Sequence, residues 1–276
     1  MFPVLNVFGL FPIPMYGTVF GIGFAIAVLI ARKIGPLYGI GRDDITFASI
    51  YGILGLLVGA KVLYFLTKLP AIIMHFDIYL RALREDPLNA ISYAFSGLVF
   101  YGGLFGAILG VYCYCRQYKV PFTPYLDIYA PLLPFVHGFG RIGCFLAGCC
   151  YGIEYHGFGS VQFPYNELVP ELNKVPRVPV QLMEAALNFI LCAVLFFLMK
   201  KKKMRAGQLL GIYFVYYAIV RYLLEKLRGD IIRGGVGQFS TSQIISMLLL
   251  PVGIVLIRGK WLEARQVKKA RQAKEV

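Results

Sequence analysis

Residues 180–199 read VQLMEAALNFILCAVLFFLM and decide the class of protein. The stretch has a single charged side chain, Glu184, and it is long and apolar enough to cross about 30 Å of hydrocarbon as a helix. Six more segments share this character, at approximately 16–34, 45–66, 97–115, 122–140, 208–225 and 241–258. We therefore predict an all-α integral membrane protein with about seven transmembrane helices.

The composition supports this prediction. Of the 276 residues, 58% are hydrophobic and 15% are charged, whereas soluble domains have about 45–50% apolar and about 25% charged residues. This excess of apolar side chains argues against a water-soluble enzyme, a disordered chain or a disulfide scaffold. We expect one polytopic membrane domain over residues 1–276. Its segment 151–178, rich in glycine and proline, is predicted to form a small extracytoplasmic insert.

The distribution of basic residues predicts the orientation. With seven spans and an external N-terminus, the segments on the cytoplasmic side hold 17 basic and four acidic residues, and the outer segments hold eight basic and seven acidic residues. The positive-inside rule then places the N-terminus outside and the C-terminus in the cytoplasm. The basic tail 259–276 is best explained by topology and by attraction to anionic lipids, so we predict no nucleic-acid partner.

A few charges remain at membrane depth, and the fourth span is interrupted by prolines. Ionised groups are costly in a bilayer, so such residues are expected to face the interior of the bundle and to be functional. A broken span is tolerated where protein or a polar cavity surrounds it. The six charged residues balance in sign: Lys61, Arg141 and Arg221 against Asp127, Glu184 and Glu225.

The densest motif, at residues 137–152, reads HGFGRIGCFLAGCCYG and follows the broken span at its outer end. Its glycines let backbone N–H groups approach a ligand closely, and the guanidinium of Arg141 can donate two parallel hydrogen bonds to a phosphate. An anionic lipid head group fits this pattern. The alternative is a glycine face for helix packing, with Arg141 reaching toward the lipid heads.

At this point the chain resembles the bacterial prolipoprotein diacylglyceryl transferases. The matching motifs occur in order along almost the whole chain: Pro14 to Gly17, Gly59 to Lys61, Gly97 to Gly106, Asp127, Gly140 to Gly143 with Gly152, Pro179 to Glu184, Gly211 to Arg228, and Gly237 to Ser240 before Gln243. Each motif is weak by itself, and their order and spacing make the resemblance specific.

The resemblance implies a bacterial enzyme of the cytoplasmic (inner) membrane, with seven helices and an active site toward the outer face. Its lipid donor is phosphatidylglycerol. The diacylglyceryl group passes to the thiol of a lipobox cysteine in the signal peptide of a preprolipoprotein, and glycerol phosphate leaves. Two alternatives remain open, namely a divergent paralogue that uses the same donor with another acceptor, and a non-catalytic protein that binds or moves lipid.

The resemblance also suggests roles for individual residues. Arg141 and Arg221 match the family arginines at the phosphate, and Tyr16 and Tyr217 match its tyrosines. Tyr217, Arg221 and Glu225 are spaced four apart and share one helix face, although Arg221 and Glu225 could merely pair to lock helices. The full predicted set for substrate binding is Tyr16, Arg141, Gly143, Cys144, Gly152, Tyr217, Arg221 and Glu225.

Three positions depart from the family pattern. Tyr101 stands where the family has the histidine taken as the catalytic base, Cys144 replaces an asparagine, and Cys149 replaces a glutamate. A tyrosine with a pKa near 10 is a poor base at neutral pH unless neighbouring arginines depress it. His137, one helical turn before Arg141, offers a substitute, so we predict that Tyr101 or His137 handles the proton and that Arg141 and Arg221 complete the catalytic set.

The cysteines invite a metal hypothesis. His137, Cys144, Cys149 and Cys150 are residue types that bind zinc, yet their spacing does not fit the usual ligand patterns. Free cysteine most often serves as a small apolar packing residue. We predict no metal and no organic cofactor.

Overall fold

The computed structural model describes residues 4–7, 11–95, 97–163, 174–201, 204–229, 235–236 and 239–259. It divides the chain into two compact units, the first formed by residues 1–31 with 126–276 and the second by residues 32–125. The basic tail from residue 260 onward and part of the predicted insert lie outside the described residues. The expectation of one polytopic domain stays a prediction.

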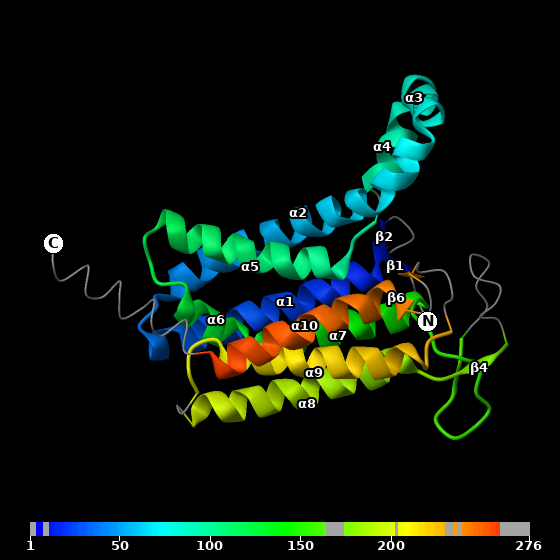
Figure 1. Ribbon diagram of the computed structural model, residues 1–276. Helices are drawn as coiled ribbons and strands as arrows, with labels where there is room; N and C mark the ends of the chain where they lie inside the picture. The colour runs from blue at the N-terminus through cyan, green and yellow to red at the C-terminus, as the bar shows by residue number, and fades with distance from the viewer. Residues whose placement is uncertain are drawn as a thin grey trace. The chain divides into compact units, whose positions relative to one another are not determined.

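The chain is mainly helical, as predicted (Figure 1). In the first unit, most of α1 (Met15–Ile34) follows a hairpin of β1 (Val4–Val7) and β2 (Phe11–Pro14), and the last three residues of α1 belong to the second unit. The unit resumes at residue 126 with most of α6 (Thr123–Tyr129) and then has α7 (Leu132–Ala147), α8 (Val180–Lys200), α9 (Gln208–Glu225) and α10 (Thr241–Arg258). Short strands β3 (Val161–Gln162), β4 (Pro176–Arg177), β5 (Gly235–Val236) and β6 (Phe239–Ser240) form two small hairpins.

The helices of the first unit pack in neighbouring pairs, α7 with α8, α8 with α9, and α9 with α10. Two contacts fix helix ends. The carboxylate of Asp127 accepts a hydrogen bond of 3.0 Å from the backbone N–H of Gly207, just before α9. At α10, the side chains of Ser240 and Gln243 each accept from the other's backbone N–H, which is a complete capping box. Both contacts satisfy backbone donors that an apolar surrounding would otherwise leave unpaired.

The second unit is built on a long helix pair. Its elements are a short 3-10 turn η1 (Gly35–Tyr38), α2 (Arg42–Met74), α3 (Phe76–Glu85), α4 (Pro87–Phe95) and α5 (Phe100–Gln117). Helix α2 packs along α5 with glycine against glycine, because Gly55 and Gly59 face Gly106 and Gly102 so closely that a Cβ on any of them would collide with partner backbone. Small residues of this kind let membrane helices approach closely.

Helix length and composition support three spans, 15–38, 42–74 and 180–200, within the described residues. Two bent helix pairs raise the number to five if each is one span: α4 with α5, bent by 80°, and α6 with α7, bent by 41°. The second bend confirms the predicted interruption of the span at 122–140. Each of the seven predicted segments contains helix: 122–140 contains α6 and α7 with a break between them, and in 97–115 the helix α5 begins at Phe100. Helix α2 runs on to Met74, beyond its predicted end near residue 66.

Candidate active site

Glu184 lies at the centre of a buried polar cluster in the first unit. Its side chain, on α8, is only 1% exposed, and its Oε1 lies 2.9 Å from Nη2 of Arg141 on α7. The same oxygen lies 3.4 Å from Nε2 of His137, one turn earlier on α7. On the other side, Oε2 is 4.0 Å from Nη1 of Arg221 on α9. One carboxylate therefore joins three helices.

A second carboxylate extends the cluster along α9. Oε2 of Glu225 lies 2.6 Å from Nη2 of Arg221 and 4.0 Å from Nε of Arg228, and all three side chains are largely buried. Arg221 Nη2 also donates to Oγ of Ser242 at 2.9 Å, at the start of α10. The predicted pairing of Arg221 with Glu225 along one helix face is thus present in the structure.

The two predicted arginines lie on either side of one carboxylate. Among the described residues, ion pairs join the guanidinium groups of Arg141, Arg221 and Arg228 to the carboxylates of Glu184 and Glu225. Guanidinium groups donate strong, directed hydrogen bonds to phosphate oxygens. Two such groups held close together at a buried position are therefore suited to binding the phosphodiester of a lipid.

Aromatic rings line the same cluster. The ring of Tyr217, on α9, lies edge-on to His137 at 5.1 Å between centroids, and it stacks on Tyr213 one turn earlier. Tyr217 is 2% exposed and His137 is 7% exposed. These contacts bring the predicted residues of α7 and α9 together, and they fix the histidine ring between a carboxylate and an aromatic side chain.

The glycines of the predicted site permit close backbone contacts. Gly143 packs against the backbone of Tyr16, so that a Cβ at residue 143 would lie 3.1 Å from the Tyr16 carbonyl oxygen. Gly152 forms a β-bridge with Arg228, and a Cβ there would collide with the carbonyl of Val178. The first contact joins α1 to the end of α7, and the second holds the segment after α7 beside the end of α9.

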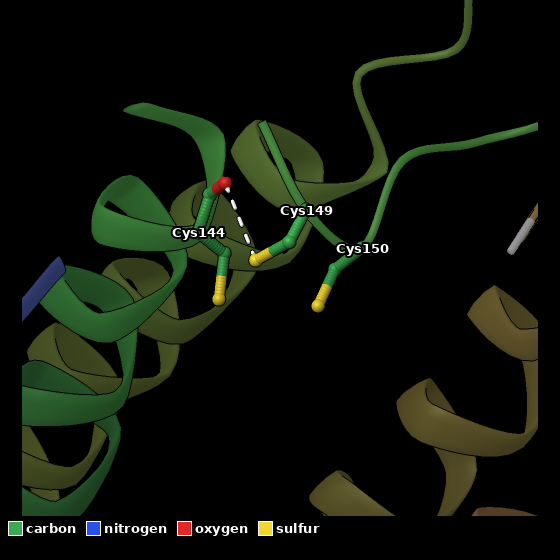
Figure 2. A group of neighbouring side chains, drawn as sticks. All are labelled: Cys144, Cys149 and Cys150. Atoms are coloured by element: carbon green, nitrogen blue, oxygen red, sulfur yellow. Dashed lines mark hydrogen bonds between the residues drawn. The ribbon is translucent and has the colours of Figure 1, made fainter. Parts of the chain in front are cut away.

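Three cysteine sulfurs gather at the end of α7 (Figure 2). The Sγ atoms of Cys144, Cys149 and Cys150 all lie within 4.8 Å of one another. Cys144 and Cys150 are buried, and Cys149 is exposed. The sequence spacing of these residues had argued against a shared site, and the structure brings them together.

Three residues that the sequence marks as functional either have another role or belong to the other unit. Asp127, a charge at membrane depth, caps the start of α9 instead of joining the cluster. Tyr101 is buried in α5 of the second unit, and its role at the site stays a prediction. Lys61 also lies in that unit, where its Nζ donates to the carbonyl of Phe95 at 2.5 Å.

Two charged residues of the cluster were not among the predicted site residues. The sequence marks Glu184 as a charge at membrane depth and as the last residue of one family motif, and Arg228 as an outer basic residue at the end of another. A signal for Glu184 is present in the sequence, because an acidic residue in an apolar helix needs a partner of opposite charge. What the sequence does not show is that the same carboxylate faces both predicted arginines.

A family model described as prolipoprotein diacylglyceryl transferase matches residues 3–258 of the chain. The chain belongs to this family. The resemblance drawn from the order of its motifs is thus confirmed.

A relative from Clostridium perfringens, phosphatidylglycerol--prolipoprotein diacylglyceryl transferase 2, is 34% identical over 261 residues, which cover 95% of this chain and 96% of the relative. A phosphatidylglycerol--prolipoprotein diacylglyceryl transferase from Clostridium tetani is 34% identical over 255 residues, which cover 92% of this chain and 96% of the relative. A transferase of the same name from Aeromonas hydrophila is 30% identical over 259 residues, which cover 92% of this chain and 89% of the relative. The similarity to this family therefore extends over almost the full length of each chain.

Proposed function

We propose that this protein transfers the diacylglyceryl group of phosphatidylglycerol to the lipobox cysteine of a preprolipoprotein, the first step of lipoprotein maturation. Membership of the family and the names of its relatives support this activity. One observation from the structure carries the proposal: the buried guanidinium groups of Arg141 and Arg221, from α7 and α9, lie on either side of the Glu184 carboxylate. Two guanidinium groups held together in this way suit the negatively charged phosphodiester of the lipid donor.

Arg141 and Arg221 are the proposed phosphate ligands. Glu184 lies next to both guanidinium groups and orients them from one side. The leaving group gains negative charge as the ester bond breaks, so cations held in place before the reaction stabilise the transition state. Tyr16 and Tyr217 position the lipid, Glu225 holds Arg221, and the backbone at Gly143, Cys144 and Gly152 completes the binding surface.

The proposed reaction exchanges one bond to carbon. The cysteine thiol loses its proton, and the sulfur attacks the terminal glyceryl carbon of the diacylglyceryl group. A carbon–sulfur bond forms while the bond from that carbon to the phosphate oxygen breaks. Glycerol phosphate leaves with the electron pair, and the thiol proton remains on a protein base until it passes to the leaving phosphate or to water.

His137 is the proposed base. Its Nε2 lies 3.4 Å from the Glu184 carboxylate, which would stabilise the imidazolium formed when the ring accepts a proton. Tyr101, at the position of the family histidine, is the competing base. We expect His137→Gln to lower kcat by about 100-fold or more and Tyr101→Phe to have the smaller effect. If Tyr101→Phe lowered kcat more than His137→Gln, Tyr101 would be the base that accepts the thiol proton.

The membrane arrangement is part of the proposal. Seven helices cross the bacterial cytoplasmic membrane, with the N-terminus outside, the C-terminus in the cytoplasm and the active site near the outer face. Phosphatidylglycerol and the signal peptide enter laterally from the bilayer, and no cofactor takes part. Fusions of an enzyme active only in the periplasm, placed after residues 66, 118, 152 and 203, should alternate in activity and give a signal at the first and third positions.

The reaction is tested with full-length protein in vesicles that contain phosphatidylglycerol with labelled glyceryl and acyl groups. We expect a lipobox peptide to acquire the diacylglyceryl label and an equal amount of glycerol phosphate to appear. A peptide with serine in place of the lipobox cysteine should stay unlabelled. Glycerol phosphate without labelled peptide would contradict the proposed acceptor and indicate the divergent paralogue. Absence of both products would contradict the enzyme and leave a lipid-binding protein.

A further inference from the structure

We infer that Cys144, Cys149 and Cys150 form a binding site for one thiophilic divalent cation, such as zinc or cadmium. Their three sulfurs lie within 4.8 Å of one another and point toward a common space (Figure 2). This inference does not depend on the transfer reaction proposed above. It also revises the expectation from sequence spacing that the cysteines hold no metal.

The end of α7 explains why the sulfurs meet. Gly148 has a left-handed backbone with a φ of 72°, and its N–H donates to the carbonyl of Phe145 at 3.2 Å, while the N–H of Cys149 donates to the carbonyl of Cys144 at 3.1 Å. These two bonds define a Schellman motif. In that motif the side chains at the positions of Cys144 and Cys149 are commonly in contact. The end of the helix therefore brings two of the three proposed ligands together.

The third sulfur is brought in by a second left-handed residue. Cys150 has a φ of 63°, which is uncommon for a residue other than glycine, asparagine or aspartate. The turn continues past α7 and leaves Cys150 buried near Cys144. The loop is also fixed from α8, because Nε2 of Gln181 donates to the carbonyl of Cys149 at 2.7 Å. The site is therefore part of an ordered turn.

The distances suit a soft cation. Zinc–sulfur bonds of about 2.3 Å place the sulfurs of a tetrahedral site about 3.8 Å apart. Sulfurs at most 4.8 Å apart reach this spacing when each moves by less than about 1 Å, which a side-chain rotation provides. Three thiolates leave a fourth position for water or another ligand, and thiolates select soft ions over magnesium or calcium.

The charge of the surroundings also favours the bound state. Binding releases three thiol protons for each ion, and a divalent cation with three thiolates has a net charge of −1. Arg141 lies one helical turn before Cys144 and interacts electrostatically with Cys144 and Cys150. The positive charge of the Arg141 guanidinium therefore offsets part of the negative charge of the complex.

The direct test is a cadmium titration of full-length protein, purified in detergent under nitrogen with a phosphine reductant and washed with chelator. Thiolate-to-cadmium absorbance reports binding without any assay of transfer. We expect saturation at one ion per chain. A variant with Cys113, Cys115 and Cys192 all changed to alanine retains the three proposed ligands and should titrate like the parent protein.

Removing the proposed ligands gives the contrast. Cys144→Ser, Cys149→Ser and Cys150→Ser should each weaken cadmium binding by more than about 100-fold, because loss of a supporting group alone costs 10–100-fold. The three single variants should also lose the rise in thermal stability that cadmium gives to the parent protein. Circular dichroism and elution volume establish that each variant is folded.

Three outcomes would overturn the inference. The first is equal cadmium absorbance in the parent protein and in a variant that has all three cluster cysteines changed to serine. The second is undiminished affinity in the single variants, which would mean that two thiols suffice. The third is a disulfide within the cluster of the protein purified under nitrogen, since it would remove two ligands.

Discussion

The two units of this protein differ in how their central helices meet. In the second unit, α2 and α5 approach each other through glycines, and the contact consists of backbone against backbone. In the first unit, α7, α8 and α9 meet at ionised side chains, with Glu184 between Arg141 and Arg221. Close packing requires only complementary shapes, whereas each buried charge requires a partner of opposite charge. We therefore expect the first unit to carry chemistry and to tolerate the loss of a single partner poorly.

The largest effect is expected from neutralising both proposed phosphate ligands. Arg141→Gln with Arg221→Gln removes the guanidinium groups that face the developing charge, and each such group is worth about 10²–10³-fold in rate. We expect turnover to fall by at least about 10⁴-fold. The measurement is peptide labelling by vesicles with equal amounts of inserted protein.

A control separates lost chemistry from lost folding. The double variant leaves Glu184 without its two guanidinium partners, so the same changes are combined with Glu184→Gln. If the triple variant is folded and still binds and turns over phosphatidylglycerol at the parental rate, the assignment of the phosphate site is wrong.

The next effect concerns stability. Glu184→Gln leaves the buried guanidinium of Arg141 without the carboxylate that pairs with it, and breaking a buried ion pair from one side costs about 3–5 kcal/mol. Thermal unfolding in detergent measures it. The matched control is Glu154→Gln, because Glu154 pairs with His156 at 2.9 Å where both side chains are more than half exposed. We expect less than about 1 kcal/mol there, and equal losses in both variants would remove the central role of Glu184.

A smaller effect is expected in the glycine-packed unit. Gly106→Ala places a methyl group against the backbone of Gly55, and overpacking of this kind costs about 1–3 kcal/mol. Gly21→Ala is the control, because a Cβ at Gly21 meets nothing within 4 Å. A stability change of similar size in both variants would contradict the proposed backbone contact between α2 and α5.

The smallest effect is expected at the start of α10. Ser240→Ala removes one half of the capping box, at a cost of about 1 kcal/mol, while Ser240→Asp keeps an acceptor for the N–H of Gln243 and should retain most of the stability. Chemical unfolding of the three proteins in parallel measures the difference. Equal stability of the alanine variant and the parent would show that the cap contributes little.

Helix positions were predictable from the sequence, because length and hydropathy determine them. The segments 180–199 and 208–225 coincide with α8 and α9 to within one residue at each end. The end of α2 was not predicted: the expected span ends near residue 66, whereas the helix continues past Lys68 and Pro70 to Met74. A helix can continue past a charge or a proline that interrupts the apolar run, although the proline itself donates no backbone hydrogen bond.

The site was predictable in its residue types and less so in its pairing. Arg141, Arg221, Tyr217 and His137 were expected to be functional, and the structure brings them together. Which carboxylate joins them depends on how three helices face each other, and no local spacing shows this. The proximity of the three thiols was not predicted, because the usual spacing patterns of zinc ligands do not include a Schellman motif such as the one at Gly148. That motif turns the chain so that Cys149 lies next to Cys144.

The length of α2 bears on how far this protein reaches from the lipid. Its 33 residues span about 50 Å at 1.5 Å per residue, and a bilayer core is about 30 Å thick. Helices α3 and α4 continue from its far end (Figure 1). If α2 is parallel to the membrane normal, roughly 20 Å of the helix extends beyond the hydrocarbon. If α2 is strongly tilted, α3 lies among the lipid head groups instead. A spin label at Arg81 distinguishes these postures by its accessibility to dissolved oxygen, which concentrates in lipid.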